Sequence, residues 1–186
     1  MGIFLTSDFH FCHNRDFVYK KRGFGSIDEM NKAIIENFNE MVGADDETYV
    51  LGDLILNDNE KGLECVRALN GKLHIILGNH DTDERIRLYK ELPNVVDVSF
   101  GARLKLGKKH FYLSHYPTLT ANPGDRAVTY NLCGHSHTTD RFVDFYKAPI
   151  YHVEVDAHNC YPVPLAQIKE EIKIKFESES FKAMIM

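Results

Sequence analysis

The first half of the chain alternates short apolar runs with segments of helical period. The runs are typical of buried strands and lie at residues 2–7, 48–51 and 73–77. Apolar residues at three- and four-residue steps predict amphipathic helices at residues 28–42, 60–69 and 83–92. Ser26, followed by Glu29, is typical of a capping box at the start of the first helix.

The second half of the chain is rich in predicted strands, at residues 95–100, 102–106, 110–114, 127–133 and 150–155. Gly101 and the turn at residues 107–109 separate the first three strands, which indicates hairpin connections. Residues 165–172 have helical spacing, whereas residues 172–176 alternate as in a strand. The sequence leaves both structures open for this last segment.

A βαβαβα half followed by a strand-rich half predicts an α/β fold in which two packed mixed sheets are flanked by helices. The chain has 186 residues, which fits one domain. Because no internal repeat, linker or low-complexity stretch divides it, we expect residues 1–186 to form that single domain, without a cap domain.

Polar residues with metal-binding side chains follow five of the predicted strands, where open α/β folds place their sites. They are Asp8 and His10, Asp53, Asn79 with His80 and Asp81, His115, and His135 with His137. In an extended chain residues i and i+2 point the same way, so we expect Asp8 and His10 to converge while Phe9 enters the core. His135 and His137 repeat this spacing.

These side chains suit borderline divalent metals, because imidazole is a good ligand of zinc, iron and nickel while carboxylate suits manganese. The set is too large for one coordination sphere but divides naturally between two ions. Asp53, a carboxylate in the middle of the set, is the best candidate for a bridging ligand. The four cysteines form no C-x-x-C pair, which argues against a structural zinc site or a redox motif.

Single motifs of this set have simpler explanations. Gly52-Asp53 alone is a common turn, and His115 alone is more often a structural histidine. Gly134-His135-Ser136-His137 is harder to explain by packing, because it places two imidazoles across a tight turn. The order of all five motifs together favours a functional site.

The complete set resembles the ordered motifs of the calcineurin-like metallophosphoesterase superfamily over about residues 4–164. The residues that carry the resemblance are Asp8-Phe9-His10, Gly52-Asp53, Gly78-Asn79-His80-Asp81, His115 and Gly134-His135-Ser136-His137. Residues 7–14, Ser114-His115-Tyr116-Pro117 and Val155-Asp156 with Asn159 and Pro162-Val163 are similar to the small single-domain bacterial and phage members. The resemblance implies a four-layer α/β/β/α sandwich.

The resemblance also implies two ligand sets. One metal would be held by Asp8, His10, Asp53 and His137, and a second by Asp53, Asn79, His115 and His135. His80 would lie near the leaving group with Asp81 behind it. We therefore expect two divalent transition-metal ions, manganese first, with iron, zinc or nickel as alternatives.

The predicted activity is hydrolysis of a phosphate ester, with a preference for diesters of small or nucleotide-like substrates. A hydroxide bridging the two metals would attack phosphorus, and His80 would protonate or stabilise the leaving oxygen while Asp81 fixes its ring. His13 and Asn14 could reach a substrate phosphate, although a role in ordering their loop is as plausible. Cys12 is interpreted as packing.

Two other functions stay open: another hydrolytic reaction of a binuclear metal site, or a binding scaffold that has lost catalysis. The intact ligand set and His80 argue against the scaffold. A formal charge of −5 argues against broad binding to nucleic acid or membranes, and the run Lys20-Lys21-Arg22 is interpreted as a solvated surface. Without a signal peptide pattern or an apolar run of about 18 residues, we expect a cytoplasmic protein outside the membrane.

Overall fold

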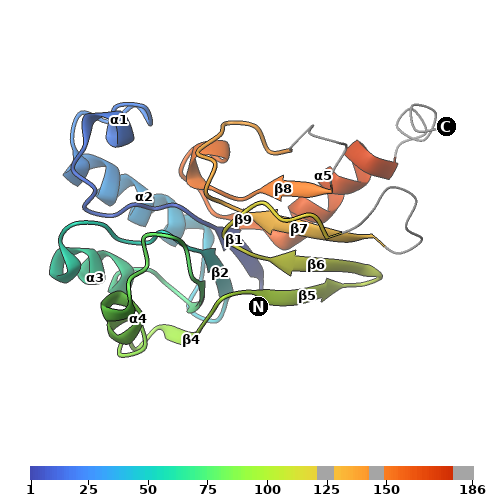
Figure 1. Cartoon of the computed structure of the whole chain (residues 1–186), viewed down its shortest axis with the longest axis horizontal. Helices are drawn as coiled ribbons and strands as arrows, with labels where there is room; N and C mark the ends of the chain where they lie inside the picture. The colour runs from blue at the N-terminus through green and yellow to red at the C-terminus, as the bar shows by residue number, and fades with distance from the viewer. Residues whose placement is uncertain (121–127, 143–148, 178–186) are drawn as a thin grey trace.

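The computed structural model describes residues 1–120, 128–142 and 149–177 (Figure 1). One sheet has five strands in the order β4-β3-β2-β1-β9. Its members are β1 (Ile3–Thr6), β2 (Glu47–Leu51), β3 (Lys72–Ile76), β4 (Val95–Ser99) and β9 (Val163–Pro164). The pairs β1–β2, β2–β3 and β3–β4 are parallel, and β9 runs antiparallel to β1.

The second sheet has four strands in the order β5-β6-β7-β8. They are β5 (Ala102–Leu106), β6 (Lys109–Leu113), β7 (Thr129–Cys133) and β8 (Ile150–His152). β5 and β6 form an antiparallel hairpin, whereas β6–β7 and β7–β8 are parallel. Both sheets are therefore mixed.

Helices α1–α4 lie on one side of the first sheet and the second sheet lies on the other (Figure 1). The helices are α1 (Asp16–Tyr19), α2 (Ile27–Met41), α3 (Asn59–Arg67), α4 (Asp83–Tyr89) and α5 (Leu165–Glu177), with a short 3-10 turn at Val155–Ala157. The Ser26 hydroxyl caps α2 by accepting a hydrogen bond from the Glu29 amide at 3.2 Å. The Glu29 carboxylate reaches back to the amide of Gly25 at 2.7 Å, one residue before the position that a capping box uses.

The period-two alternation of the central strands divides two cores between the two faces of the first sheet. Phe4, Val50 and Ile75 pack with the helices α2–α4, while their neighbours face the second sheet. That second core contains Leu5, Leu51 and Ile76 from the first sheet, Phe111, Leu113 and Leu132 from the second, and Leu165, Ile168 and Ile172 from α5. The predicted pair of packed mixed sheets flanked by helices is confirmed.

Most predicted elements are present with boundaries that shift by a few residues, and the differences concern the pairing of one strand and the presence of short elements. The strand β4 pairs in parallel with β3 and not in a hairpin with β5, so the chain changes sheets at Gly101. Residues 172–176 are helical, because Ile172 belongs to the buried side of α5. The short elements α1 and β9 were not predicted. Ala127, predicted as the first residue of β7, lies outside the described residues.

Gly62 tests the packing of α3 against the first core. In a solvated helix interior, alanine is favoured over glycine by about 0.8–1 kcal/mol. A Cβ at Gly62, however, would lie 2.7 Å from Cγ2 and 2.8 Å from Cβ of Ile55. We expect Gly62→Ala to lower the midpoint of thermal unfolding, measured by circular dichroism. An unchanged or higher midpoint would show that α3 can move away from Ile55 without cost.

Candidate metal centre

Seven polar side chains converge beyond the carboxyl ends of strands from both sheets. Asp8 and His10 follow β1, Asp53 follows β2 and Asn79 follows β3; His115 follows β6, and His135 and His137 follow β7. Parallel strands bring such residues to one edge of a sheet, and the packing of the two sheets brings the two edges together. The structure thus assembles the residues that the sequence had spread over 130 positions of the chain.

One group of donor atoms is formed by Asp8, His10, His137 and Asp53. Nε2 of His10 lies 3.1 Å from Nε2 of His137 and 3.7 Å from Oδ2 of Asp53. Oδ1 of Asp8 lies 3.9 Å from Nε2 of His10 and 3.8 Å from Nε2 of His137. Asp8, His10 and Asp53 are buried, and His137 is partly exposed.

A second group lies on the other side of Asp53. Oδ1 of Asn79 is 2.9 Å from both Nε2 of His115 and Nδ1 of His135, and these two nitrogens are 3.2 Å apart. Nε2 of His115 lies 3.5 Å from Oδ2 of Asp53. Nδ1 of His115 donates to the carbonyl of Leu51 at 2.8 Å, so its Nε2 carries the lone pair that faces the group.

Asp53 belongs to both groups through a single oxygen. Its Oδ1 accepts a hydrogen bond from the amide of His80 at 2.9 Å. Its Oδ2 faces His10 on one side and His115 on the other.

The residues of both groups fit divalent metal ions. Oδ1 of Asp8 is buried with no hydrogen-bond partner, although a buried carboxylate needs compensation. Donor atoms of Asp8, His10 and His137 lie close enough to share one ion, as do those of Asp8, Asp53 and His115. Imidazole, carboxylate and amide donors without cysteine match first-row transition metals.

Burial disfavours the charged form of several of these groups in the metal-free protein. It raises the pKa of Asp8 from its ordinary value of 3.8 to about 6, and it lowers the pKa of His10 from 6.5 to about 2. Burial also lowers the pKa of His135. A neutral imidazole is the form that binds a metal, so these histidines need not lose a proton to do so.

The backbone at the site differs from the expected extended form. The φ angles lie in the left-handed region at Asp8 (59°), His10 (51°), Asp53 (55°), His135 (73°) and His137 (49°). Asp8 and His10 do converge, but through tight turns beyond the strand. The extended geometry from which we predicted this was wrong. The Asp8 amide donates to the Gly52 carbonyl and the His10 amide to the Asp53 carbonyl, each at 3.0 Å, which holds these turns against the end of β2.

Arg22 and Asp156 support the first group from behind. Nδ1 of His137 donates to Oδ2 of Asp156 at 3.0 Å, and the Arg22 guanidinium binds both oxygens of that carboxylate at 3.1 and 2.8 Å. Arg22 also donates to the carbonyls of Asp8 and Phe9. Burial alone would raise the pKa of Asp156, but its hydrogen bonds to His137 and Arg22 hold that pKa well below the ordinary range.

Arg22 is therefore not part of a solvated basic surface, as the sequence had suggested, because its side chain is only 3% exposed. Its neighbours remain at the surface: Lys20 pairs with Asp16, and Lys21 donates to the carbonyl of His137 at 2.6 Å. A run of three cations carries no signal that the third turns inward. Asp156 was part of the motif resemblance, but sequence reasoning gave it no role.

Asp81 shapes the turn that carries Asn79 and His80. Its Oδ2 accepts from the amides of Asp53 and Gly78 at 3.0 and 2.8 Å, and its Oδ1 accepts from the hydroxyl of Tyr89 at 2.8 Å. Among the hydrogen bonds of the described residues, none joins Asp81 to the ring of His80, which sequence reasoning had expected. Asp81 instead holds the backbone at Asp53 and at Gly78, the residue before Asn79.

His80 lies at the rim of the centre. Its side chain is 42% exposed, and its Nε2 is 3.9 Å from Oδ2 of Asp53. Its ring centroid is 5.5 Å from that of His10. The carbonyl of His80 accepts from the buried Arg85 at 2.6 Å, a contact that sequence reasoning missed.

Of the two expected substrate-binding residues, His13 lies beside the centre and Asn14 is exposed at the surface. The ring of His13 is half-buried and 5.4 Å from that of His10. Cys12 turns toward Asn31, whose side-chain amide is 3.7 Å from its sulfur.

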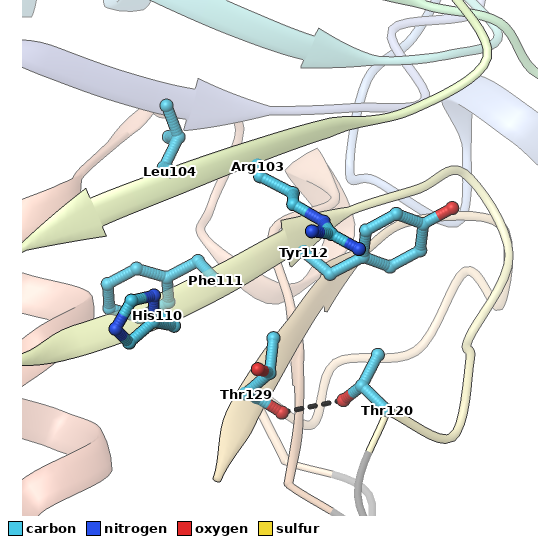
Figure 2. Close-up of a pocket in the computed structure, with 7 residues that line it drawn as sticks. All are labelled: Arg103, Leu104, His110, Phe111, Tyr112, Thr120 and Thr129. Carbon is cyan, nitrogen blue, oxygen red and sulfur yellow. Dashed lines mark hydrogen bonds between the residues drawn. The ribbon is translucent and has the colours of Figure 1, made fainter. Parts of the chain in front are cut away.

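A separate cavity of about 480 Å³ opens on the outer face of the second sheet (Figure 2). Arg103 of β5, His110 and Tyr112 of β6, and Thr129 of β7 line it, and Thr120 donates to the carbonyl of Thr129 at 2.6 Å. None of its lining residues belongs to the two donor groups.

Comparison with known proteins gives the family. A family model described as a calcineurin-like phosphoesterase superfamily domain matches residues 1–149. An uncharacterized protein of Methanocaldococcus jannaschii is 34% identical over 181 residues, which is 92% of this chain and 91% of that protein. The gene 66 protein of Mycobacterium phage D29 is 26% identical over 196 residues, covering 92% and 96%.

Two solved structures show that the fold is shared. A protein of unknown function from Aquifex aeolicus matches with a TM-score of 0.68 at 20% identity, over 91% of this chain and 98% of that one. A protein described as a novel archaeal phosphodiesterase matches with a TM-score of 0.50 at 15% identity, over 83% and 82%.

The sandwich of two mixed sheets, with Asp and His donors able to bind metal, defines a metal-dependent hydrolase. The chain belongs to the calcineurin-like phosphoesterase superfamily, so the predicted resemblance is confirmed and the protein is a metallophosphoesterase. Within the described ranges of the chain, no helix has the length and apolar character needed to span a bilayer.

Asp8 makes the stability of the metal-free protein depend on pH. Because its folded pKa of about 6 lies above the ordinary 3.8, the folded state binds the proton more tightly, and this stabilisation is lost as pH rises through about 6. Asparagine tolerates the left-handed backbone and stays neutral. We expect Asp8→Asn to unfold at a higher temperature than the metal-free parent at pH 8, with a smaller difference at pH 4.

With saturating metal at pH 8, the parent should unfold at a higher temperature than Asp8→Asn. Only the parent keeps a full ligand set, and bound metal stabilises the folded state. Scanning calorimetry at both pH values, with and without metal, measures both effects. A metal-free difference that does not grow with pH would contradict the raised pKa.

Gly78 and Gly134 allow the carboxylates to approach the backbone. A Cβ on Gly134 would overlap with Oδ2 of Asp8, and a Cβ on Gly78 would overlap with Oδ1 of Asp53. We expect Gly78→Ala and Gly134→Ala each to weaken metal binding by roughly 10–100-fold, as for loss of groups that orient ligands. Gly43→Ala, whose Cβ would meet its nearest neighbour at 3.4 Å, is the control. Equal affinities by titration calorimetry would show that the close contacts are not needed.

Proposed function

We propose that the chain hydrolyses phosphodiesters with two divalent metal ions, one held by Asp8, His10, Asp53 and His137 and the other by Asp53, Asn79, His115 and His135. The observation that carries this proposal is the position of Asp53. Its Oδ2 faces donor nitrogens of both groups while its Oδ1 is fixed by the His80 amide. A carboxylate in this position is suited to bridge two ions.

The charge of such a centre suits a phosphate ester. Two divalent ions bring +4, and Asp8 and Asp53 bring −2, so the centre keeps +2 although the whole chain is acidic. When bound, the ions would supply a water activated near neutral pH and a clamp for the phosphoryl oxygens. Manganese is our proposed native metal, and the nitrogen-rich second group also suits iron, zinc or nickel.

His80 is the proposed general acid. Its ring lies at the partly exposed rim, and its backbone is held on both sides by Asp53 and Arg85. The ring can thus meet the leaving oxygen without filling a ligand position. His13, whose ring lies between those of His10 and Phe17, is the proposed contact to a phosphate oxygen, with Asn14 beside it.

The openness of the site supports a diester substrate. Asn79 and His135 are exposed, and His80 and His137 are partly exposed. A phosphate in the centre could therefore carry a substituent on each side. This supports small or nucleotide-like diesters as substrates.

Asp53→Asn should impair the enzyme more than loss of any single terminal ligand, because it removes negative charge from the position shared by both ions. We expect Asp53→Asn to lose both bound metal and hydrolysis of bis(p-nitrophenyl) phosphate, whereas Asn79→Ala retains more of each. Asp45→Asn, which changes the same charge at an exposed position, is the control. Metal content by mass spectrometry equal to that of the parent would contradict a bridging Asp53.

His80→Ala should separate catalysis from metal binding. If His80 is the acid, the variant keeps its metals but turns over roughly 10²–10⁴-fold more slowly on a diester with an alkoxide leaving group. The loss should be smaller for a p-nitrophenolate leaving group, which needs little help from a proton. His110→Ala, an exposed histidine on the outer face of the second sheet, is the control. Equal losses on both esters, or loss of a metal, would count against the acid.

A further inference from the structure

Two exposed aromatic rings flank the metal centre, one beside each donor group. Phe17 of α1 is 70% exposed and Tyr116 is 50% exposed. Single exposed apolar side chains are common at protein surfaces, but these two rings lie beside the donor groups, where the bases of a bound substrate can stack on them.

Phe17 lies on the side of the first group. Its ring meets that of His13 edge-on, with centroids 5.7 Å apart, and His13 in turn lies 5.4 Å from His10. The ring of His80 is 5.5 Å from that of His10, so Phe17 and the proposed acid share this side of the centre. With His80 as the acid, the leaving group would depart on the side of Phe17.

Tyr116 lies on the side of the second group. Its ring centroid is 4.6 Å from that of His135 and 5.1 Å from that of His115. The hydroxyls of Ser114 and Thr118 both donate to its backbone carbonyl, at 2.8 and 2.9 Å. The half-exposed ring thus stands on a fixed backbone, which lowers the entropic cost of stacking a ligand on it.

Cations accompany the aromatic ring on the Phe17 side. Arg15 precedes α1, the helix that carries Phe17, and Lys21 follows it, and both are exposed. The Lys21 ammonium lies 2.6 Å from the carbonyl of His137. Aromatic platforms beside positive charge are the combination by which proteins bind single-stranded nucleic acid. The overall charge of −5 confines this attraction to the neighbourhood of the site.

We propose that the substrate is the internucleotide phosphodiester of a short single-stranded oligonucleotide, with the base of the leaving nucleoside stacked on Phe17 and that of the retained nucleotide on Tyr116. This inference rests on the proposed phosphodiesterase function. Hydrolysis breaks the bond from phosphorus to the leaving oxygen and forms one from phosphorus to a water oxygen. One proton of that water ends on the leaving nucleoside, and the products are a free hydroxyl and a phosphomonoester.

Dinucleotides that lack one base test the proposal directly. The substrates are TpT and its two analogues in which the residue on one side or the other is an abasic tetrahydrofuran, so that the reacting ester is unchanged. The kcat/KM of each is measured for the manganese-loaded parent, Phe17→Ala, Tyr116→Ala and the ring-conserving Tyr116→Phe. Phe100→Ala replaces an exposed ring at the end of β4 and is the control. Metal content is measured for every variant.

We expect the parent to prefer TpT over each abasic analogue by at least roughly fivefold, the lower end of what one base–aromatic stack contributes. Phe17→Ala should lose the preference for the base on the leaving side only. Tyr116→Ala should lose it on the retained side only, while Tyr116→Phe and Phe100→Ala keep both preferences.

Equal rates of the parent on all three dinucleotides, or unchanged preferences in both alanine variants, would overturn this inference. If the inference alone is wrong, the parent still hydrolyses bis(p-nitrophenyl) phosphate. If the proposed phosphodiesterase function is wrong, that diester is not hydrolysed either, so the two failures are distinguishable.

Discussion

The site depends on how the carboxylate of Asp53 is held. One oxygen is fixed by the His80 amide, which leaves the other between the two donor groups. The Asp53 amide is itself held by Asp81, which also binds the amide of Gly78. The Asp81 carboxylate thus joins the ends of β2 and β3 and fixes the backbone that carries Asp53 and Asn79.

Strained backbone collects at the same site. Five site residues have left-handed φ angles, at a cost of roughly 1 kcal/mol or more each for residues other than glycine. Hydrogen bonds from Asp8 and His10 to the end of β2 hold two of these turns in the metal-free chain. The unpartnered oxygen of Asp8 and its raised pKa show that folding alone does not satisfy the site, whereas a bound cation would.

Sequence patterns predicted the strands and the residues at their ends because both follow from local rules. The last residues of β2 (Val50 and Leu51) and of β3 (Ile75 and Ile76) are apolar and buried, so polar residues that follow them directly lie at the edge of the sheet. The partner of β4 could not be predicted in this way. The same local sequence pattern before Gly101 fits a strand that pairs with β5 and a strand that belongs to the other sheet, as β4 does. Likewise, the sequence left residues 172–176 open between helix and strand, and only the packing of Ile172 in the second core shows why they are helical.

The supporting residues were the least predictable part of the site. Arg22 lies in a basic run and Asp156 in a C-terminal motif, and only the fold shows that they form one ion pair behind His137. Asp81 was assigned to the His80 ring from the family resemblance, but its hydrogen bonds go to the backbone and to Tyr89. Contacts that depend on long-range packing leave no spacing signal.

The central claim is that Asp53 would be a ligand common to two metal ions, and electron paramagnetic resonance tests it most directly. The protein would be titrated with Mn²⁺ to one and then two equivalents while the spectrum is followed. Two ions that share a carboxylate are spin-coupled, so the account predicts that the sextet of an isolated ion gives way to the broad signal of a coupled pair. Persistence of the isolated-ion spectrum at two bound equivalents, or saturation at one, would contradict it.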